Sequence, residues 1–343
     1  MKKVVSVLLC IAFLAGLCSC GGNNEYDTLE LTAMNTVMKI TVFKNSETDT
    51  KKLLDNMRDC IEKIDGLMDV NNPDSDISRV NDAAVGVAVK VDYHTAHILE
   101  KALAAYQYTD SLFDVKLLPV ITLWGFDNGN YGVPKDADIA DALESVGKAS
   151  FEVNTVDNTV VKHTETQIAL GGIAKGYLGD VLLQLAEDVN ATALINLGGN
   201  IVLAGDKTDG TPWSVGIKNP VDTEGLACSF EGSGGLSVVT SGAYERYFEY
   251  GGKTYHHIID PATGYPADSD LLSVSVIGEE GAVCDALSTA LFVGGKEKAI
   301  EFTKEFDSYE FILITENNEL FYTAGIKNIE VSDDTFTLKE IER

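Results

Sequence analysis

Asp285 and Thr289 stand four positions apart in the acidic and hydroxyl-bearing stretch DALST. Residues i and i+4 share one face of a helix, so this carboxylate and this hydroxyl can point at one spot. A carboxylate and a hydroxyl, completed by a backbone carbonyl and water, are ligands that suit Mg²⁺. Alternatively, Asp285 caps the start of the helix and Thr289 is simply packed. The spacing alone supports both interpretations equally.

A second candidate site is the glycine pair Gly171 and Gly172, which opens a helical pattern containing Lys175. Glycines at such a turn let backbone N–H groups approach an anion, and the helix start adds a partial positive charge. Lys175 is placed where its positive charge could offset the negative charge of a phosphate. A tight turn without any ligand accounts for the same glycines, and the spacing is that of neither a Walker loop nor a dinucleotide fingerprint.

Two of the five histidines, His256 and His257, are adjacent and precede a turn that contains Asp260. In an extended segment neighbours point to opposite faces, so we expect one ring to face inward and the other solvent. This arrangement disfavours a zinc pair. An inward histidine beside Asp260 could be a general base, a donor to phosphate, or a satisfied core residue.

Aromatic side chains next to glycine occur at Trp124, Gly125 and Phe126. They could line a pocket for a flat ring or belong to an ordinary core. The elements that position these groups follow from hydrophobic periodicity. We expect helices at about 50–68, 96–108 and 284–306, with another after Gly172, and a polar connection after Pro134. Strands are expected at 38–43, 151–153, 159–161, 193–195, 201–203, 213–217, 236–239 and 272–277, followed by a hairpin at 311–323.

Strands and helices do not alternate strictly, which favours an α+β fold over a doubly wound parallel sheet. The 343 residues are 45% hydrophobic, enough for a substantial core. The formal charge of −27 repels nucleic-acid backbones, so we expect no nucleic-acid partner. An anionic substrate would need local cations or a metal.

The first residues have the pattern of a bacterial lipoprotein leader. Two lysines, an apolar run too short to span a bilayer, and Leu17-Cys18-Ser19-Cys20 follow one another. We expect a signal peptide at 1–19, lipidation of Cys20, a tether at 20–30 and one domain at 31–343. Acyl chains on Cys20 would anchor the protein to the extracytoplasmic side of a bacterial membrane. A plain signal peptide is the alternative.

The ordered motifs resemble the ApbE family of flavin transferases, from Met34 to about residue 306. The motifs are MNTVM at 34–38, PDS at 73–75 with Ser78, Arg79 and Asn81, FD at 113–114, LWGF at 123–126, GGIAKGY at 171–177, NLGGN at 196–200, TSGAYERY at 240–247, HIIDPATG at 257–264, and the pair Asp285 and Thr289.

The resemblance implies two T-fold-like lobes of antiparallel sheet and helices with FAD in the cleft between them. It implies Mg²⁺-dependent transfer of FMN from FAD to a threonine hydroxyl of an acceptor protein, releasing AMP. Acceptors would be subunits of membrane redox complexes or extracytosolic flavoproteins. The residues implied are His257 as catalytic group, Asp285, Thr289 and the Gly172 carbonyl as metal ligands, and Met34, Asn71, Trp124, Gly125, Phe126, Ala169 and Lys175 as FAD contacts.

Several positions depart from the family pattern. Asn35 replaces a glycine, Lys116 a small threonine, and Ala169 an aspartate. Asn71 stands where an aromatic residue often covers the flavin, so water could reach the diphosphate, and we expect some hydrolysis of FAD to FMN and AMP. Two alternatives therefore stand beside the transferase: a metal-dependent FAD diphosphatase, and a non-catalytic flavin-binding lipoprotein.

Overall fold

The structure is a computed structural model that describes residues 25–343. The expected signal peptide and Cys20 lie outside the described residues and stay predictions. Within 25–343, none of the helices has the length and apolar character needed to cross a membrane.

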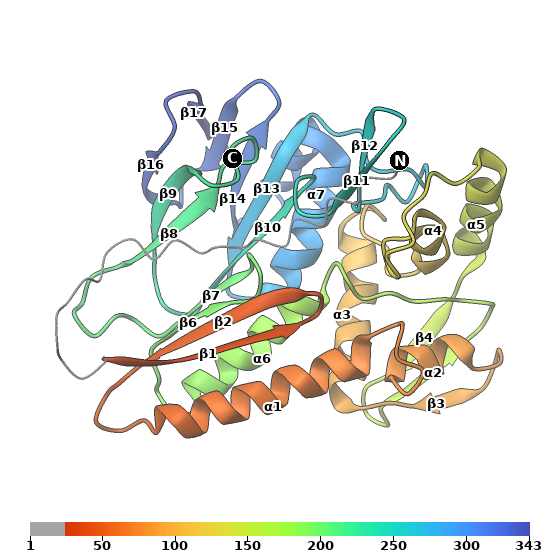
Figure 1. The fold of residues 1–343 in the computed structure, drawn as a ribbon, viewed down its shortest axis with the longest axis horizontal. Coiled ribbons are helices and arrows are strands. Elements are labelled where there is room, and N and C mark those ends of the chain that lie inside the picture. The colour runs from red at the N-terminus through yellow and green to blue at the C-terminus, as the bar shows by residue number, and fades with distance from the viewer. Residues whose placement is uncertain (1–24) are drawn as a thin grey trace.

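One nine-stranded sheet organises the chain (Figure 1). All neighbouring strands are antiparallel except the last pair, β15 and β17, which is parallel. The spatial order is β1 (Tyr26–Ala33), β2 (Thr36–Phe43), β6 (Ala193–Asn196), β7 (Ile201–Ala204), β10 (Leu236–Gly242), β13 (Leu271–Gly278), β14 (Glu310–Thr315), β15 (Glu319–Thr323) and β17 (Thr337–Ile341).

Helices cover one face of this sheet. They are α1 (Thr50–Met68), α6 (Ala174–Glu187) and α7 (Gly281–Phe302), and α3 (Tyr93–Tyr108) packs against α1 and α7. In α1 the Asp49 side chain accepts from the Lys52 N–H and fixes the first turn. On β10 and β13, Val239 and Val276 point into the core shared with α7.

A three-stranded sheet covers the other face. It consists of β8 (Trp213–Lys218), β9 (Leu226–Gly232) and β16 (Lys327–Val331). Val238 and Ile277, one position away from the residues that face α7, pack toward this small sheet. The period-two alternation therefore builds two cores on the opposite faces of the large sheet.

The remaining elements form a lateral unit, at the right of Figure 1. They are α2 (Asp76–Asp82), α4 (Leu118–Trp124), α5 (Asp136–Lys148) and the strands β3 (Ala88–Lys90), β4 (Phe151–Asn154) and β5 (Thr159–Lys162). The hairpin of β11 (Tyr247–Tyr250) and β12 (Lys253–His256) lies near α4.

The expected α+β class is confirmed, while the division into two lobes stays a prediction. Residues 26–30, expected in the tether, instead begin β1. The reason is pairing: β1 is in register with β2 along its whole length, and Leu29 is buried against the core. The polar connection expected after Pro134 is also wrong, because α5 forms there.

Candidate active site

Asp285 lies where α6 and α7 cross. The Gly176 N–H donates to Oδ2 of Asp285 at 2.8 Å. A Cβ on Gly176 would lie 2.1 Å from the Gly281 carbonyl oxygen and 2.7 Å from Asp285 Cβ, so only glycine allows this approach. Asp285 therefore reaches the first turn of the other helix.

This geometry decides the question about Asp285 that the spacing left open. Helix α7 begins at Gly281, and Asp180 of α6 accepts from the N–H groups of Gly281 and Ala282. Asp180 thus caps α7, whereas Asp285 lies beyond its first turn. The helix-cap interpretation of Asp285 is wrong.

Two of the groups expected to hold a metal, Asp285 and Thr289, share one face of α7, and Thr289 lies beside Gly172. The Thr289 hydroxyl oxygen is 3.7 Å from the position that a Cβ on Gly172 would take. Asp285, 5% exposed, is on the same face of α7 one turn earlier. A carboxylate, a hydroxyl and a neighbouring backbone segment are hard oxygen donors, so the set fits Mg²⁺. No group of three or more His, Cys, Asp or Glu residues suited to a metal occurs within 25–343.

Lys175 supplies positive charge to this site. Burial raises the pKa of Asp285, while the Lys175 ammonium, the Gly176 N–H and the Asn200 amide favour its charged form. Desolvation also raises the pKa of Glu245, and the charge of Lys175 opposes that shift. Lys175 is thus within electrostatic reach of two carboxylates.

His257 belongs to the same site. It follows β12 directly, and its ring lies edge-on to Phe126 with centroids 6.4 Å apart. Desolvation holds the pKa of His257 well below 6.5, and the charges of Arg246, His256 and Lys175 add to the effect. Its surroundings therefore favour the neutral imidazole, which has one ring nitrogen free to accept a proton.

His256 faces a different partner. Its Nε2 lies 3.1 Å from the Ala267 carbonyl oxygen, and its ring packs edge-on against Phe292. The two rings thus have separate surroundings, as an extended segment requires. Both are half-buried, so the expectation that one would face solvent is wrong.

Glu245 and Arg246 reach this site as well, although the sequence did not single them out as site residues. Glu245 Oε1 is 3.6 Å from the Cβ position of Gly199, a glycine with φ 108°. The turn at Gly199 follows β6, whereas Glu245 follows β10, so strands far apart in sequence bring these residues together. The TSGAYERY motif contained the signal, without indicating what it contacts.

Two expected FAD contacts lie in turns. Met34 and Asn35 connect β1 and β2 with φ of 48° and 58°, and the Met34 N–H donates to Asp65 Oδ1 at 3.1 Å. Asparagine tolerates this left-handed conformation, which explains how Asn35 replaces a glycine. Asn71 is exposed, and its Nδ2 donates to the Asp127 carbonyl oxygen at 2.9 Å.

The aromatic segment has a mainly supporting position. Trp124 is fully buried, and its Nε1 donates to the Gly264 carbonyl oxygen at 2.8 Å. Gly125 ends α4 with φ 78°, and a Cβ there would lie 2.3 Å from the Asn130 carbonyl oxygen. Of the three expected contacts, Phe126 is the one whose ring meets His257.

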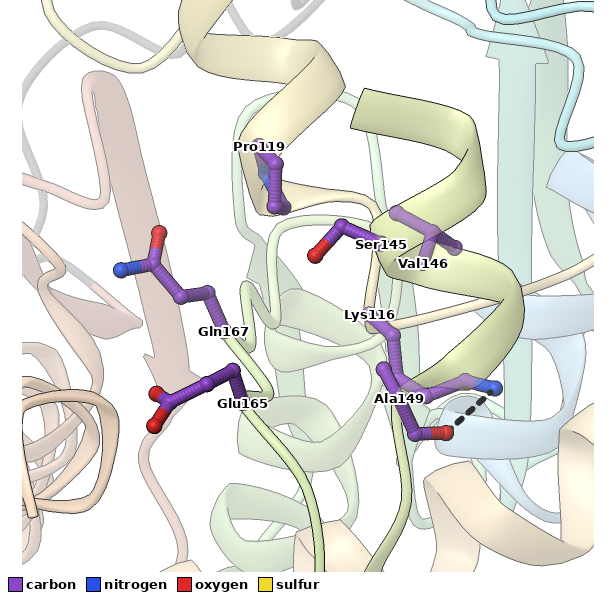
Figure 2. Close-up of a pocket in the computed structure, with 7 residues that line it drawn as sticks. All are labelled: Lys116, Pro119, Ser145, Val146, Ala149, Glu165 and Gln167. Atoms are coloured by element: carbon purple, nitrogen blue, oxygen red, sulfur yellow. Dashed lines mark hydrogen bonds between the residues drawn. The ribbon is translucent and has the colours of Figure 1, made fainter. Parts of the chain in front are cut away.

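A cavity of about 240 Å³ lies along the segment that leads to Gly172 (Figure 2). The Ala169 N–H donates to the Val115 carbonyl oxygen at 2.8 Å, which holds the segment in place. Lys116 pairs with Asp114 at 3.5 Å, and its Nζ donates to the Ala149 carbonyl oxygen at 3.5 Å. The lining residues are Lys116, Pro119, Ser145, Val146, Ala149, Glu165 and Gln167.

Comparisons with known proteins agree on one family. The ApbE family model matches residues 34–313. A Treponema pallidum protein named FAD:protein FMN transferase is 32% identical, covering 98% of this chain and 97% of that one. A Klebsiella pneumoniae protein of the same name is 34% identical over 77% of this chain and 82% of its own.

Solved structures agree with the sequences. The crystal structure of the Thermotoga maritima ApbE protein has a TM-score of 0.78 at 30% identity, covering 90% of this chain and 97% of that one. The flavin transferase ApbE from Vibrio cholerae has a TM-score of 0.74 at 25% identity, with 90% and 98% covered.

Proposed function

Since the chain belongs to the ApbE family, we propose that it transfers FMN from FAD to a threonine hydroxyl of an acceptor protein and releases AMP. The observation that carries the proposal is the meeting of Asp285, Thr289 and Gly172 beside Lys175. A diphosphate bound by so acidic a protein needs local positive charge. Lys175 supplies part of it.

We assign the metal to the oxygen donors at the crossing of α6 and α7. Asp285, Thr289 and the Gly172 carbonyl would hold Mg²⁺, which supplies positive charge to the diphosphate and stabilises the departing AMP. The Gly176 N–H orients the Asp285 carboxylate at 2.8 Å. The chain thus fixes its one charged ligand before any ion binds.

The acceptor threonine must lose its hydroxyl proton during this transfer. The threonine oxygen forms a bond to the FMN phosphorus, the bond from that phosphorus to the bridging oxygen breaks, and AMP leaves with the electron pair. We assign the proton of the acceptor threonine to His257, because a neutral imidazole has one ring nitrogen free to accept it. The ring of Phe126 lies edge-on to that imidazole.

The test is mass spectrometry of an acceptor protein incubated with this enzyme, FAD and Mg²⁺. We expect one threonine to gain the mass of FMN minus water, with AMP in equal amount. EDTA should abolish both products. An acceptor of unchanged mass in the presence of active controls from another ApbE protein contradicts the proposal.

A second activity, hydrolysis of FAD to FMN and AMP, is favoured by Asn71. Its side chain is small, exposed and bonded to the Asp127 carbonyl oxygen, so it shields the site from water less than an aromatic ring would. Without acceptor, FAD and Mg²⁺ should yield AMP, and Asn71→Phe should lower that rate. AMP at the level of a blank without enzyme refutes this activity.

We also propose that the enzyme is a lipoprotein on the extracytoplasmic side of a bacterial membrane, anchored through Cys20. Its acceptors would be subunits of membrane redox complexes or extracytosolic flavoproteins. The basis is the leader sequence that ends at Cys20. Membrane fractionation of the wild type and Cys20→Ala is the test: the variant should leave the membrane fraction, and equal distribution contradicts the anchor.

A further inference from the structure

Three buried or half-buried hydroxyls lie beside the proposed metal site and connect to one another. Thr289 Oγ1 is 3.3 Å from Ser241 Oγ, and Ser241 Oγ is 2.8 Å from Ser288 Oγ. Ser288 Oγ donates to the Asp285 carbonyl oxygen at 2.9 Å. Ser241 comes from the end of β10, so the chain of contacts crosses from the sheet to α7.

The bond from Ser288 to the Asp285 carbonyl oxygen sets the donor and the acceptor in the other two hydroxyl contacts. A carbonyl oxygen can only accept, so the single hydroxyl proton of Ser288 is committed to Asp285. Ser288 must therefore accept from Ser241. Ser241 has then used its own proton, so it must accept from Thr289.

Without Ser241, Thr289 would have another choice. A threonine within a helix commonly donates to the carbonyl four residues earlier, which for Thr289 is that of Asp285. Ser288 already bonds this carbonyl oxygen. Ser241 draws the Thr289 proton away from the helix axis instead, toward β10.

We propose, on the basis of the function given above, that Ser241 is a positioning residue that makes Thr289 a cation ligand. With its proton held by Ser241, the Thr289 oxygen has only lone pairs left for the side that faces Gly172. An oxygen in that state can bind a metal and cannot donate to a phosphate. Ser288 fixes the direction of this chain of hydrogen bonds from Thr289 through Ser241 to Ser288, which we call the relay.

The test measures Mn²⁺ affinity by calorimetry on the full protein without FAD or acceptor. Replacing a residue that hydrogen-bonds a metal ligand commonly lowers metal affinity by about 10–100-fold. We therefore expect Ser241→Ala to weaken Mn²⁺ binding at least tenfold. The matched control is Ser275→Ala, because Ser275 is also buried and shares a hydroxyl contact of 2.7 Å with Thr240, away from Thr289. It should stay within twofold of the wild type.

The reference is Asp285→Ala, which removes the charged ligand. If it binds Mn²⁺ as tightly as the wild type, the metal assignment fails and the relay fails with it. If Asp285→Ala binds Mn²⁺ weakly while folded Ser241→Ala binds it as tightly as the wild type, only the proposed role of Ser241 is overturned. Should Ser241→Ala not fold, Ser288→Ala breaks the relay at its other end and must also weaken Mn²⁺ binding, and unchanged affinity overturns the proposal.

Discussion

The Nδ1 atom of His257 lies 3.2 Å from the carbonyl oxygen of Arg246. A carbonyl oxygen accepts, so this contact assigns the proton of the neutral ring to Nδ1 and leaves Nε2 with the free lone pair. The Arg246 carbonyl also accepts the His257 backbone N–H at 3.1 Å, which holds the residue as well as its ring.

The pH profile should therefore be flat well into the acid range. Desolvation and the charges of Arg246, His256 and Lys175 hold the pKa of His257 well below 6.5. Protonation removes the base, so activity is lost only as pH falls through that lowered value. We expect constant kcat/KM between pH 8 and 6.5, measured by AMP release. A decline centred at 6.5 or above contradicts this role.

His257→Gln should lower kcat by about 10²–10⁴-fold, the usual contribution of a general base. His256→Gln is the matched control, because His256 bonds the Ala267 carbonyl and packs on Phe292, away from Phe126. Its transfer rate should stay within threefold. Equal losses in the two variants would show that His257 has only a structural role.

Asp285→Asn should reduce FMN transfer by about 10²-fold or more, because it removes the one charged ligand of the proposed metal while its amide oxygen can still accept from Gly176. The control is Asp260→Asn, since Asp260 bonds within its own turn to Ala262 and Thr263. The readout is AMP release against Mg²⁺ concentration. An unchanged Mg²⁺ dependence in Asp285→Asn would rule out the ligand.

Gly176→Ala should destabilise the fold by about 1–3 kcal/mol, because its Cβ would lie 2.1 Å from the Gly281 carbonyl oxygen. Gly171→Ala is the control, since nothing lies within 4 Å of a Cβ there. Urea unfolding gives both values. Equal midpoints would mean that α6 and α7 tolerate separation at this point.

Local patterns predicted part of this molecule well. The bounds of α1 are those expected, because a regular apolar face and the Asp49 cap act within one segment. Helix α5 was missed because only Ile139 and Val146 are buried, too few for a clear period. Helix α7 ends earlier than expected and is interrupted at Gly295, which has φ 74°.

In the candidate site, too, local patterns predict some contacts and not others. The i, i+4 spacing placed Asp285 and Thr289 on one face of α7, and that needed only helix geometry. The contacts of Ser241 with Thr289 and of Glu245 with Gly199 depend on β10 lying next to α7 and near the Gly199 turn. Such contacts arise from strand order, which short-range patterns do not contain.

The early start of β1 would leave only a short tether to a lipid anchor at Cys20. The sheet begins at Tyr26, so only six peptide steps separate it from Cys20. Fully extended, they span about 20 Å. If Cys20 is lipidated, the Tyr26 end of the sheet would lie within that distance of the lipid headgroups.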